Sequence, residues 1–387
     1  MPVDHLMFPL QVKFGEGAIR VLGKYFSERG ITRVLVVTDP GVRKAGIVDI
    51  VIDQLLTGNI ECEVFDGAHE NPTDDNVYEG IEVYRKGKFE ALVAVGGGSP
   101  MDAAKGIQLL ASHPGKLDQY CLANNGADKI KPDVPPLVAV PTTAGTGSEV
   151  SIYSVITHSE DNVKRGYASP YLIPTLALID PELMATMPPK LTAATGMDAL
   201  CHCIESYVSK LSYSPANALA LEGARLIAGS LERAVSNGRD MRARADMAMG
   251  SMLGAMAFNL NSLGAVHSLA HQLSTVVGLP HGVANAIMLP PVMEFNLGYA
   301  QSKYAELGRI MTGERDSDDS AMAARAVEYV RQLSKTIRIP ESLRSVGVEE
   351  KHLQLMAHNG YAIDVNHLTN PRPCSEEDFL DLYRQVF

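Results

Sequence analysis

The stretch Ala91-Leu-Val-Ala-Val-Gly-Gly-Gly-Ser-Pro-Met-Asp-Ala-Ala-Lys-Gly106 decides the fold of this chain. Its first five residues form an unbroken apolar run, which is typical of a strand covered on both faces. Three glycines follow, and a helical segment then begins. We expect Ser99 to cap this helix, Pro100 to occupy its first turn and Asp102 to complete a Ser-x-x-acid capping box. The order strand, glycines, helix predicts a parallel α/β sheet.

The same alternation of apolar β-rich runs and helical patterns continues on both sides of this stretch. It predicts a Rossmann-like α/β domain with a parallel sheet over residues 1–187. The sequence pattern changes at Met187-Pro-Pro-Lys190. After this point, stretches rich in Ala, Leu and Met predict an all-helical domain over residues 188–387. The other predicted strands are Val34–Thr38, Cys62–Phe65, Leu137–Val140 and Leu176–Ile179, and Asp74–Lys86 is a predicted helix.

Composition bounds the class of protein. The 387 residues are 46% hydrophobic and 20% charged, as in a globular enzyme with substantial cores. A net charge of −11 argues against nucleic acid or an anionic membrane as the main partner. The start resembles no secretory signal and no apolar run approaches about twenty residues. Five cysteines at irregular spacing suit a reducing compartment, so we expect a cytoplasmic protein without membrane or nucleic-acid partners.

Three polar loops follow predicted strands in the first half. The glycines after Val95 allow backbone amides to approach an anion at a helix N-terminus, although a tight turn explains them about equally well. The loop Pro141-Thr-Thr-Ala-Gly-Thr-Gly-Ser-Glu149 suits a diphosphate or ribose, and a solvated turn is the alternative. Asp39 at the end of another strand suits a ribose or a simple turn. All three would share the carboxyl edge of one sheet, where such folds bind ligands.

Five side chains of the second half are candidate metal donors. Asp198 and His202 stand four positions apart, as do His267 and His271, so each pair would share one helix face. His281 follows in Leu279-Pro-His-Gly282. The spacing alone does not decide which of the five bind an ion. The thiols of Cys201 and Cys203 would be rotated about 100° from the ligand direction, which favours a packing role.

Taken together, these segments resemble the iron-containing, or group III, alcohol dehydrogenase family. The resemblance runs from about residue 8 to the C-terminus. It is carried by the following motifs: Asn71-Pro-Thr73, Gly96-Gly-Gly-Ser-Pro100, Pro141–Glu149, Ala194-Thr-Gly-Met-Asp-Ala-Leu200, Pro280-His-Gly-Val-Ala-Asn285 and Asn370-Pro-Arg372.

The resemblance implies a dinucleotide-binding domain, a helical domain and a divalent metal in the cleft between them. It assigns the metal to Asp198, His202, His267 and His281, and it places His271 beside the metal near the substrate. From that position we expect His271 to move the proton between substrate and solvent. It places Asp39 at the adenosine ribose, which favours NAD(H) over NADP(H). The other implied dinucleotide contacts are Asn71, Gly97, Gly98, Ser99, Thr142, Thr143, Thr146, Val155 and Lys164.

The implied activity is hydride transfer between C4 of the nicotinamide and a small alcohol or aldehyde of about two to four carbons. Family precedent favours Fe²⁺, with Zn²⁺ second. Phe258, Tyr153 and His367 are candidate substrate contacts. His367 and Tyr153 would suit a polar or anionic tail, whereas a surface histidine and a core phenylalanine are the ordinary alternatives.

Three further expectations follow from the resemblance. A reductase for a small anionic aldehyde is the first alternative activity, and a dehydroquinate-synthase-like or sugar-phosphate enzyme of the same fold is the second. We also expect a homodimer or higher homo-oligomer, formed through a strand over Phe8–Phe14 that pairs across subunits.

Overall fold

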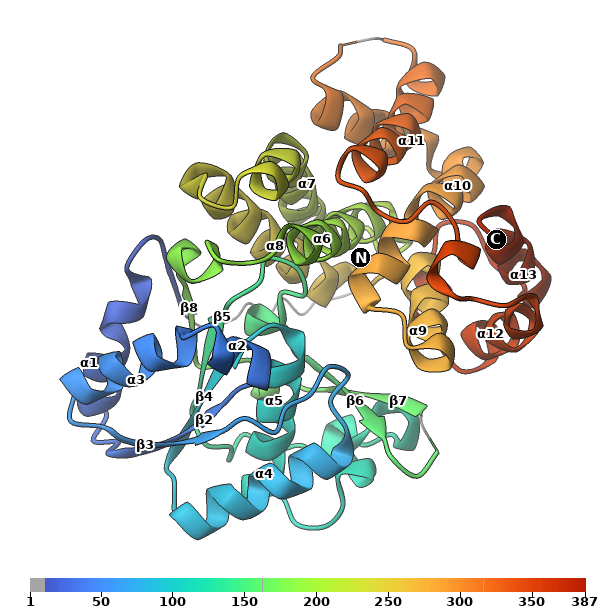
Figure 1. Ribbon diagram of the computed structural model, residues 1–387. Helices are drawn as coiled ribbons and strands as arrows, with labels where there is room; N and C mark the ends of the chain where they lie inside the picture. The colour runs from blue at the N-terminus through green and yellow to red at the C-terminus, as the bar shows by residue number, and fades with distance from the viewer. Residues whose placement is uncertain (1–10, 162, 316) are drawn as a thin grey trace. The chain divides into compact units, whose positions relative to one another are not determined.

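The structure, a computed structural model, describes residues 11–161, 163–315 and 317–387. Their contacts divide the chain into two compact units (Figure 1). The first unit runs to Thr143 and continues over Gly147–Thr186. The second comprises Ala144–Thr146 and Met187–Phe387.

The first unit is built on a six-stranded sheet in which every pairing is parallel. Its order is β1-β8-β5-β4-β2-β3, so the chain crosses over between neighbouring strands, as the alternating pattern predicted. The five predicted strands are all present. Their bounds are β2 Arg33–Val37, β3 Glu61–Phe65, β4 Ala91–Gly96, β5 Leu137–Pro141 and β8 Leu176–Ile179, and β1 is Val12–Phe14.

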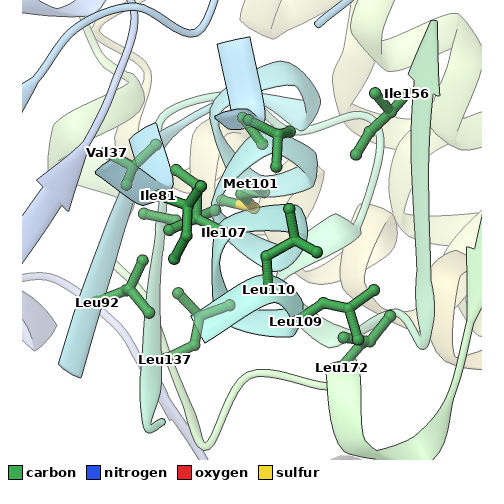
Figure 2. Close-up of a cluster of buried hydrophobic side chains, with 14 of the residues drawn as sticks. Val37, Ile81, Leu92, Met101, Ile107, Leu109, Leu110, Leu137, Ile156 and Leu172 are labelled. Carbon is green, nitrogen blue, oxygen red and sulfur yellow. The ribbon is translucent and has the colours of Figure 1, made fainter. Parts of the chain in front are cut away.

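Helices cover both faces of this sheet, which explains why its strands are apolar throughout. Leu35 and Leu92 pack with α4 and α5 in one core cluster, whereas Val34 and Val93 pack with α1 and α3 in the other. Figure 2 shows part of the first cluster, in which Ile107 of α5 lies beside Ile81 of α4. The helices are α1 Leu22–Ser27, α2 Pro40–Lys44, α3 Ile47–Thr57, α4 Asp74–Gly87 and α5 Gly98–Ser112.

An antiparallel hairpin, which the sequence did not predict, stands apart from the main sheet. It consists of β6 (Tyr153–His158) and β7 (Val163–Ala168). It is joined to the segment before α4, because the amide of Thr157 donates to the carbonyl of Pro72 at 2.8 Å. The hairpin therefore places residues of β6 and β7 beside Asn71.

The second unit confirms the prediction of a helical C-terminal part. Among its described residues there is no strand. Long helix α10 contains Pro290 and Pro291 and is kinked at Ala300. None of the helices within the described residues combines the length and apolarity needed to span a bilayer. The helices are α6 Pro189–Val208, α7 Ser214–Ser236, α8 Met241–Asn261, α9 Ala265–Val277, α10 His281–Thr312, α11 Asp319–Thr336, α12 Glu350–Ala362 and α13 Glu376–Gln385.

Candidate active site

Three helices of the second unit bring the four predicted ligands together. Asp198 and His202 lie one turn apart on α6, His267 lies on α9, and His281 is the first residue of α10. The Nε2 atoms of His202, His267 and His281 lie 3.7, 3.8 and 3.7 Å from the same oxygen, Oδ1 of Asp198.

The approach of α10 to α6 depends on a glycine. A Cβ added at Gly282 would lie 2.4 Å from the carbonyl oxygen of Ala194, so a larger residue would push the start of α10 away from α6. Pro280 precedes the helix as its N-cap residue. The Pro-His-Gly sequence therefore sets where the imidazole of His281 enters the site.

These donor atoms fit a divalent transition-metal ion. An ion with tetrahedral ligands at about 2.1 Å separates those ligands by about 3.4 Å, close to the distances observed here. The donor atoms of Asp198, His267 and His281 lie within 4.8 Å of one another. Nε2 of His202 is also close to this group, at 3.7 Å from Asp198 Oδ1. One carboxylate with three imidazoles suits Fe(II) or Zn(II).

The two innermost imidazoles are held in the neutral form that metal ligation requires. Burial lowers the pKa of His202 to about 4, and it lowers the pKa of His267 to about 4 as well. Their side chains are 5% and 2% exposed, so solvent cannot stabilise a charged ring. At neutral pH both rings can therefore present a lone pair to a cation.

Asn285, to which the sequence pattern assigned no role of its own, points into the donor set. Its Nδ2 donates to Asp198 Oδ1 at 2.6 Å and lies 3.2 Å from His267 Nε2 and 3.0 Å from His281 Nε2. The amide stands one helical turn after His281 on α10. The Asn285 amide therefore lies against the same atoms of Asp198, His267 and His281 that would face an ion.

His271 lies next to the donor set and has a carboxylate partner. Its ring is stacked on that of His281, with 5.2 Å between centroids. Its Nδ1 is 2.6 Å from Oδ2 of Asp364. Burial raises the pKa of Asp364, but the neighbouring His271 and the donors Ser268 and Asn366 bring it well below its ordinary value. Asp364 is therefore an anion that fixes the orientation of His271, and sequence reasoning assigned it no role.

The glycine loop differs from its predicted capping. Helix α5 begins at Gly98, with Gly97 as N-cap residue and with no capping hydrogen bond from any described side chain. The predicted Ser99–Asp102 box is therefore wrong. Asp102 instead accepts hydrogen bonds from Ser148 Oγ at 2.8 Å and from the amide of Val155 at 3.1 Å. The amides of the first turn are left available to an anion, which suits a diphosphate.

The other two loops meet the glycine loop at the carboxyl edge of the sheet. A Cβ added at Gly97 would lie 3.1 Å from Thr143 Oγ1, and one added at Gly96 would lie 3.4 Å from Asp39 Oδ2. The amide of Thr142 donates to the Gly96 carbonyl at 2.9 Å. Gly96 has φ +146°, a conformation that favours glycine. Thr146 clusters with the second unit.

The hairpin brings three further predicted contacts together. Lys164 Nζ donates to Asn71 Oδ1 at 2.9 Å, and the Val155 amide is tied to Asp102. Burial lowers the pKa of Lys164 to about 8. Behind the hairpin, buried Lys105 donates to Ser148 Oγ at 3.1 Å and to the carbonyls of Ser151 and Tyr153 at 2.8 and 2.7 Å. Sequence reasoning missed Lys105, although it lies six positions after Ser99 on α5.

The candidate substrate residues occupy different surroundings. Phe258 is 7% exposed, and its ring lies 4.9 Å from that of His202, so it is both a core residue and a neighbour of a predicted ligand. His367 is also 7% exposed and packs between Tyr361 and Phe379, at 5.4 and 5.6 Å between ring centroids. The surface alternative for His367 is therefore wrong. The carbonyl of Tyr153 accepts from Lys105 in the first unit.

Cys201 lies closer to the donor set than helix geometry suggested. Its Sγ is 3.9 Å from His267 Nδ1, on the side of that ring away from Asp198. Together with Glu205 and His267 it forms a second group of possible donors. Burial raises the pKa of the Cys201 thiol well above its ordinary value. The Sγ of Cys201 thus lies on the Glu205 side of His267, away from the atoms of Asp198, His202 and His281 that face one another.

Two family models match nearly the whole chain. The model described as iron-containing alcohol dehydrogenase matches residues 9–181, and the model for the C-terminal part of the Fe-containing alcohol dehydrogenase family matches residues 192–387. The chain belongs to the iron-containing alcohol dehydrogenase family. It is accordingly an oxidoreductase acting between alcohols and carbonyl compounds.

Proteins of known activity or structure are similar to this chain over its full length. The chain is 42% identical to a 1,3-propanediol dehydrogenase from Klebsiella pneumoniae, covering 97% of this chain and 96% of that protein. A crystal structure of 1,3-propanediol oxidoreductase shares 41% identity with a TM-score of 0.96 and 100% of each chain covered. A sulfoacetaldehyde reductase from Bifidobacterium kashiwanohense, in complex with NAD⁺, shares 26% identity with a TM-score of 0.89, covering 100% and 99%.

Proposed function

We propose that this chain is a cytoplasmic, Fe²⁺-dependent and NAD(H)-linked alcohol dehydrogenase or aldehyde reductase for neutral substrates of about two to four carbons. The observation that carries the proposal is the convergence of Asp198, His202, His267 and His281 around one carboxylate oxygen. Zn²⁺ is the second candidate metal, because the same donors accept it. Membership of the iron-containing family favours iron.

In this proposal, residues 1–187 bind the dinucleotide. The free amides at the start of α5 receive the diphosphate, and Asp39 accepts hydrogen bonds from the adenosine ribose. The negative charge of Asp39 disfavours the 2′-phosphate of NADP(H). Lys164 and Asn71, which already contact each other, lie on the hairpin side of the site. The remaining proposed contacts are Gly97, Gly98, Ser99, Thr142, Thr143, Thr146 and Val155.

Residues 188–387 supply the metal ligands and the proton acceptor in this proposal. When bound, the ion stabilises negative charge on the substrate oxygen, and the nicotinamide accepts or donates the hydride at C4. Asp364 accepts the Nδ1 hydrogen of His271, so that Nε2 of His271 has a lone pair with which to receive the alcohol proton. In the reductive direction, the same nitrogen returns the proton.

Phe258, Tyr153 and His367 are the proposed substrate contacts, and of these Phe258 lies beside His202. His367 does not support the anionic-aldehyde alternative, because burial lowers its pKa and the ring is neutral at pH 7. A neutral ring can donate one hydrogen bond but supplies no charge. Full-length similarity to alcohol dehydrogenases leaves no observation in favour of the dehydroquinate-synthase-like alternative.

We also propose a homo-oligomer that uses the edge of the sheet. Residues 8–10 of the predicted Phe8–Phe14 strand lie outside the described residues. The described part, β1 (Val12–Phe14), pairs with β8 of its own chain at one edge of the sheet order. A second copy would then have to add to the other side of β1. Light scattering on the purified protein tests this.

Turnover with a panel of short aldehydes tests the main proposal. We expect NADH-linked reduction of neutral aldehydes, loss of activity with a chelator and recovery on anaerobic addition of Fe²⁺. His271→Ala should keep the bound metal but lower kcat by about 10²- to 10⁴-fold, as expected when a proton acceptor is removed. Full activity with an unchanged pH profile in His271→Ala would show that His271 is not the proton acceptor.

A further inference from the structure

Glu205 occupies the same face of α6 as the two ligands from that helix. It lies seven positions after Asp198 and three after His202, so the three side chains point in one direction. It is 4% exposed. A buried carboxylate needs strong partners, and the nearest one is a ligand from another helix.

The contacts of Glu205 engage both of its oxygens. Oε2 lies 2.6 Å from Nδ1 of His267, and Oε1 accepts the amide hydrogen of Val266 at 2.7 Å. A Cβ added at Gly264 would lie 2.7 Å from Oε1, so a glycine is needed for this approach. One oxygen thus holds the start of α9, and the other holds the imidazole that α9 carries.

The two ring nitrogens of His267 therefore have different partners on opposite sides of the ring. Nδ1 faces Glu205, while Nε2 faces Asp198 Oδ1 at 3.8 Å. A carboxylate accepts but does not donate hydrogen bonds, so it selects the tautomer with hydrogen on Nδ1. That tautomer leaves the lone pair on Nε2, which is the nitrogen directed at the donor set.

The net charge of the occupied metal site also favours a role for Glu205 in metal binding. A divalent ion held by three neutral imidazoles and Asp198 alone would leave one positive charge in a buried site. Burial raises the pKa of Glu205, but a divalent ion bound beside it would favour the anionic carboxylate, which would neutralise that charge. Buried charges are costly unless they are paired, so the second carboxylate stabilises the occupied site.

We propose that Glu205 is a positioning residue of the metal centre, which fixes the ligating tautomer of His267 and supplies the second negative charge that retains the ion. This inference rests on the proposed function, because it requires Asp198, His202, His267 and His281 to bind a metal. It concerns retention of the metal rather than contact with the substrate.

A purely structural role, namely capping of α9, is the alternative, and two variants distinguish it. In Glu205→Gln, the amide oxygen can still accept the Val266 hydrogen, but an NH₂ group would face His267 and favour the tautomer that cannot ligate through Nε2. Glu205→Ala removes both contacts. Capping alone predicts greater damage from Ala, whereas positioning predicts that Gln is at least as damaging to metal binding.

The experiment measures Co²⁺ binding to the full-length protein by competition with a chelator, together with the visible absorption spectrum of the bound Co²⁺. We expect Glu205→Gln to weaken Co²⁺ binding by about 10- to 100-fold and to alter the spectrum. Glu306→Gln is the control for changing a carboxylate that contacts α6 into an amide, at an exposed position. Glu306 accepts a hydrogen bond from Tyr207 of α6 but is not among the metal donors, so its variant should bind Co²⁺ like the wild type.

Wild-type binding in Glu205→Gln, with an unchanged spectrum, would overturn the proposal, as would weaker binding by Glu205→Ala than by Glu205→Gln. Equal losses in Glu205→Gln and the Glu306→Gln control would also overturn it, because general loss of charge would then suffice. If the wild type itself bound no Co²⁺, the metal site and the proposed function would fail together. Thermal unfolding of each variant separates loss of metal from loss of fold.

Discussion

Substitution of Asp39 tests the choice between NAD(H) and NADP(H), because one carboxylate oxygen caps a helix and the other faces the proposed ribose site. Oδ1 accepts the Val42 amide hydrogen at 2.9 Å and caps α2. Oδ2 lies on the side of Gly96, since a Cβ added there would be 3.4 Å away. The turn and ribose interpretations of Asp39 are therefore compatible. Asp39→Asn should keep the cap, because Asn and Asp are equally good at this position, while removing the charge.

The size of the effect follows from the charge that is removed. Two unit charges about 5 Å apart repel by about 1 to 3 kcal/mol for effective dielectric constants between those of water and of a protein surface. Such energies correspond to about 5- to 150-fold in a ratio of kcat/KM. Asp39 is partly exposed, so salt should screen the effect and the lower part of this range applies.

The assay compares kcat/KM for NADPH and NADH in the wild type and in Asp39→Asn at low and high ionic strength. We expect the variant to raise the NADPH/NADH ratio within the stated range, with a smaller difference between the proteins at high salt. Asp39→Ala serves as the second variant, because it also removes the cap and should lower stability by about 1 kcal/mol. An unchanged ratio in Asp39→Asn would refute the placement of Asp39 at the ribose.

Three other variants test the surroundings of the sites. Asp364→Asn should lower kcat more than it changes KM, because it loosens the hold on His271; an unaltered kcat would contradict the role of that pair. Lys105→Met should lower the free energy of unfolding by about 3 kcal/mol, measured with urea, because Asp102 and Glu149 lose their buried counter-ion. His158 is buried beside Asp74, Asp118, Asp161, Arg165 and Tyr167, and burial lowers its pKa below 6.5. Its stabilising contribution is present above pH 6.5 and is lost as pH falls through the folded-state pKa, so His158→Gln should flatten the decline of stability below pH 6.5.

Much of the fold could be predicted because its signals are local. Strands covered on both faces must be apolar at every position, and Val34 to Val37 and Ala91 to Val95 show that pattern directly. Helix α4 was predicted over Asp74–Lys86 and observed over Asp74–Gly87, because Thr73 caps it and apolar residues recur at helical spacing. The hairpin β6–β7 was missed because its strands lie outside the buried sheet and include polar residues such as Lys164 and Arg165.

Local sequence spacing could not predict which histidines of the site are metal ligands. The i, i+4 spacing placed Asp198 with His202, but it gave His267 and His271 the same status, and the resemblance was needed to separate them. In the structure both histidines contact a carboxylate through Nδ1, so that contact does not separate them. They differ in position: Nε2 of His267 lies 3.8 Å from Asp198 Oδ1, in the donor group with His281, whereas His271 is outside that group.

Both carboxylates lie far from their histidines in sequence, 62 and 93 positions away, so no spacing rule could pair them. Ser99 failed as a cap for a related reason. Asp102, which would have completed its capping box, is drawn instead to Ser148 and Val155 in the buried network of Lys105. In each case a long-range polar contact, which only the folded chain can form, decides what the residue does, and the proposed chemistry depends on those contacts.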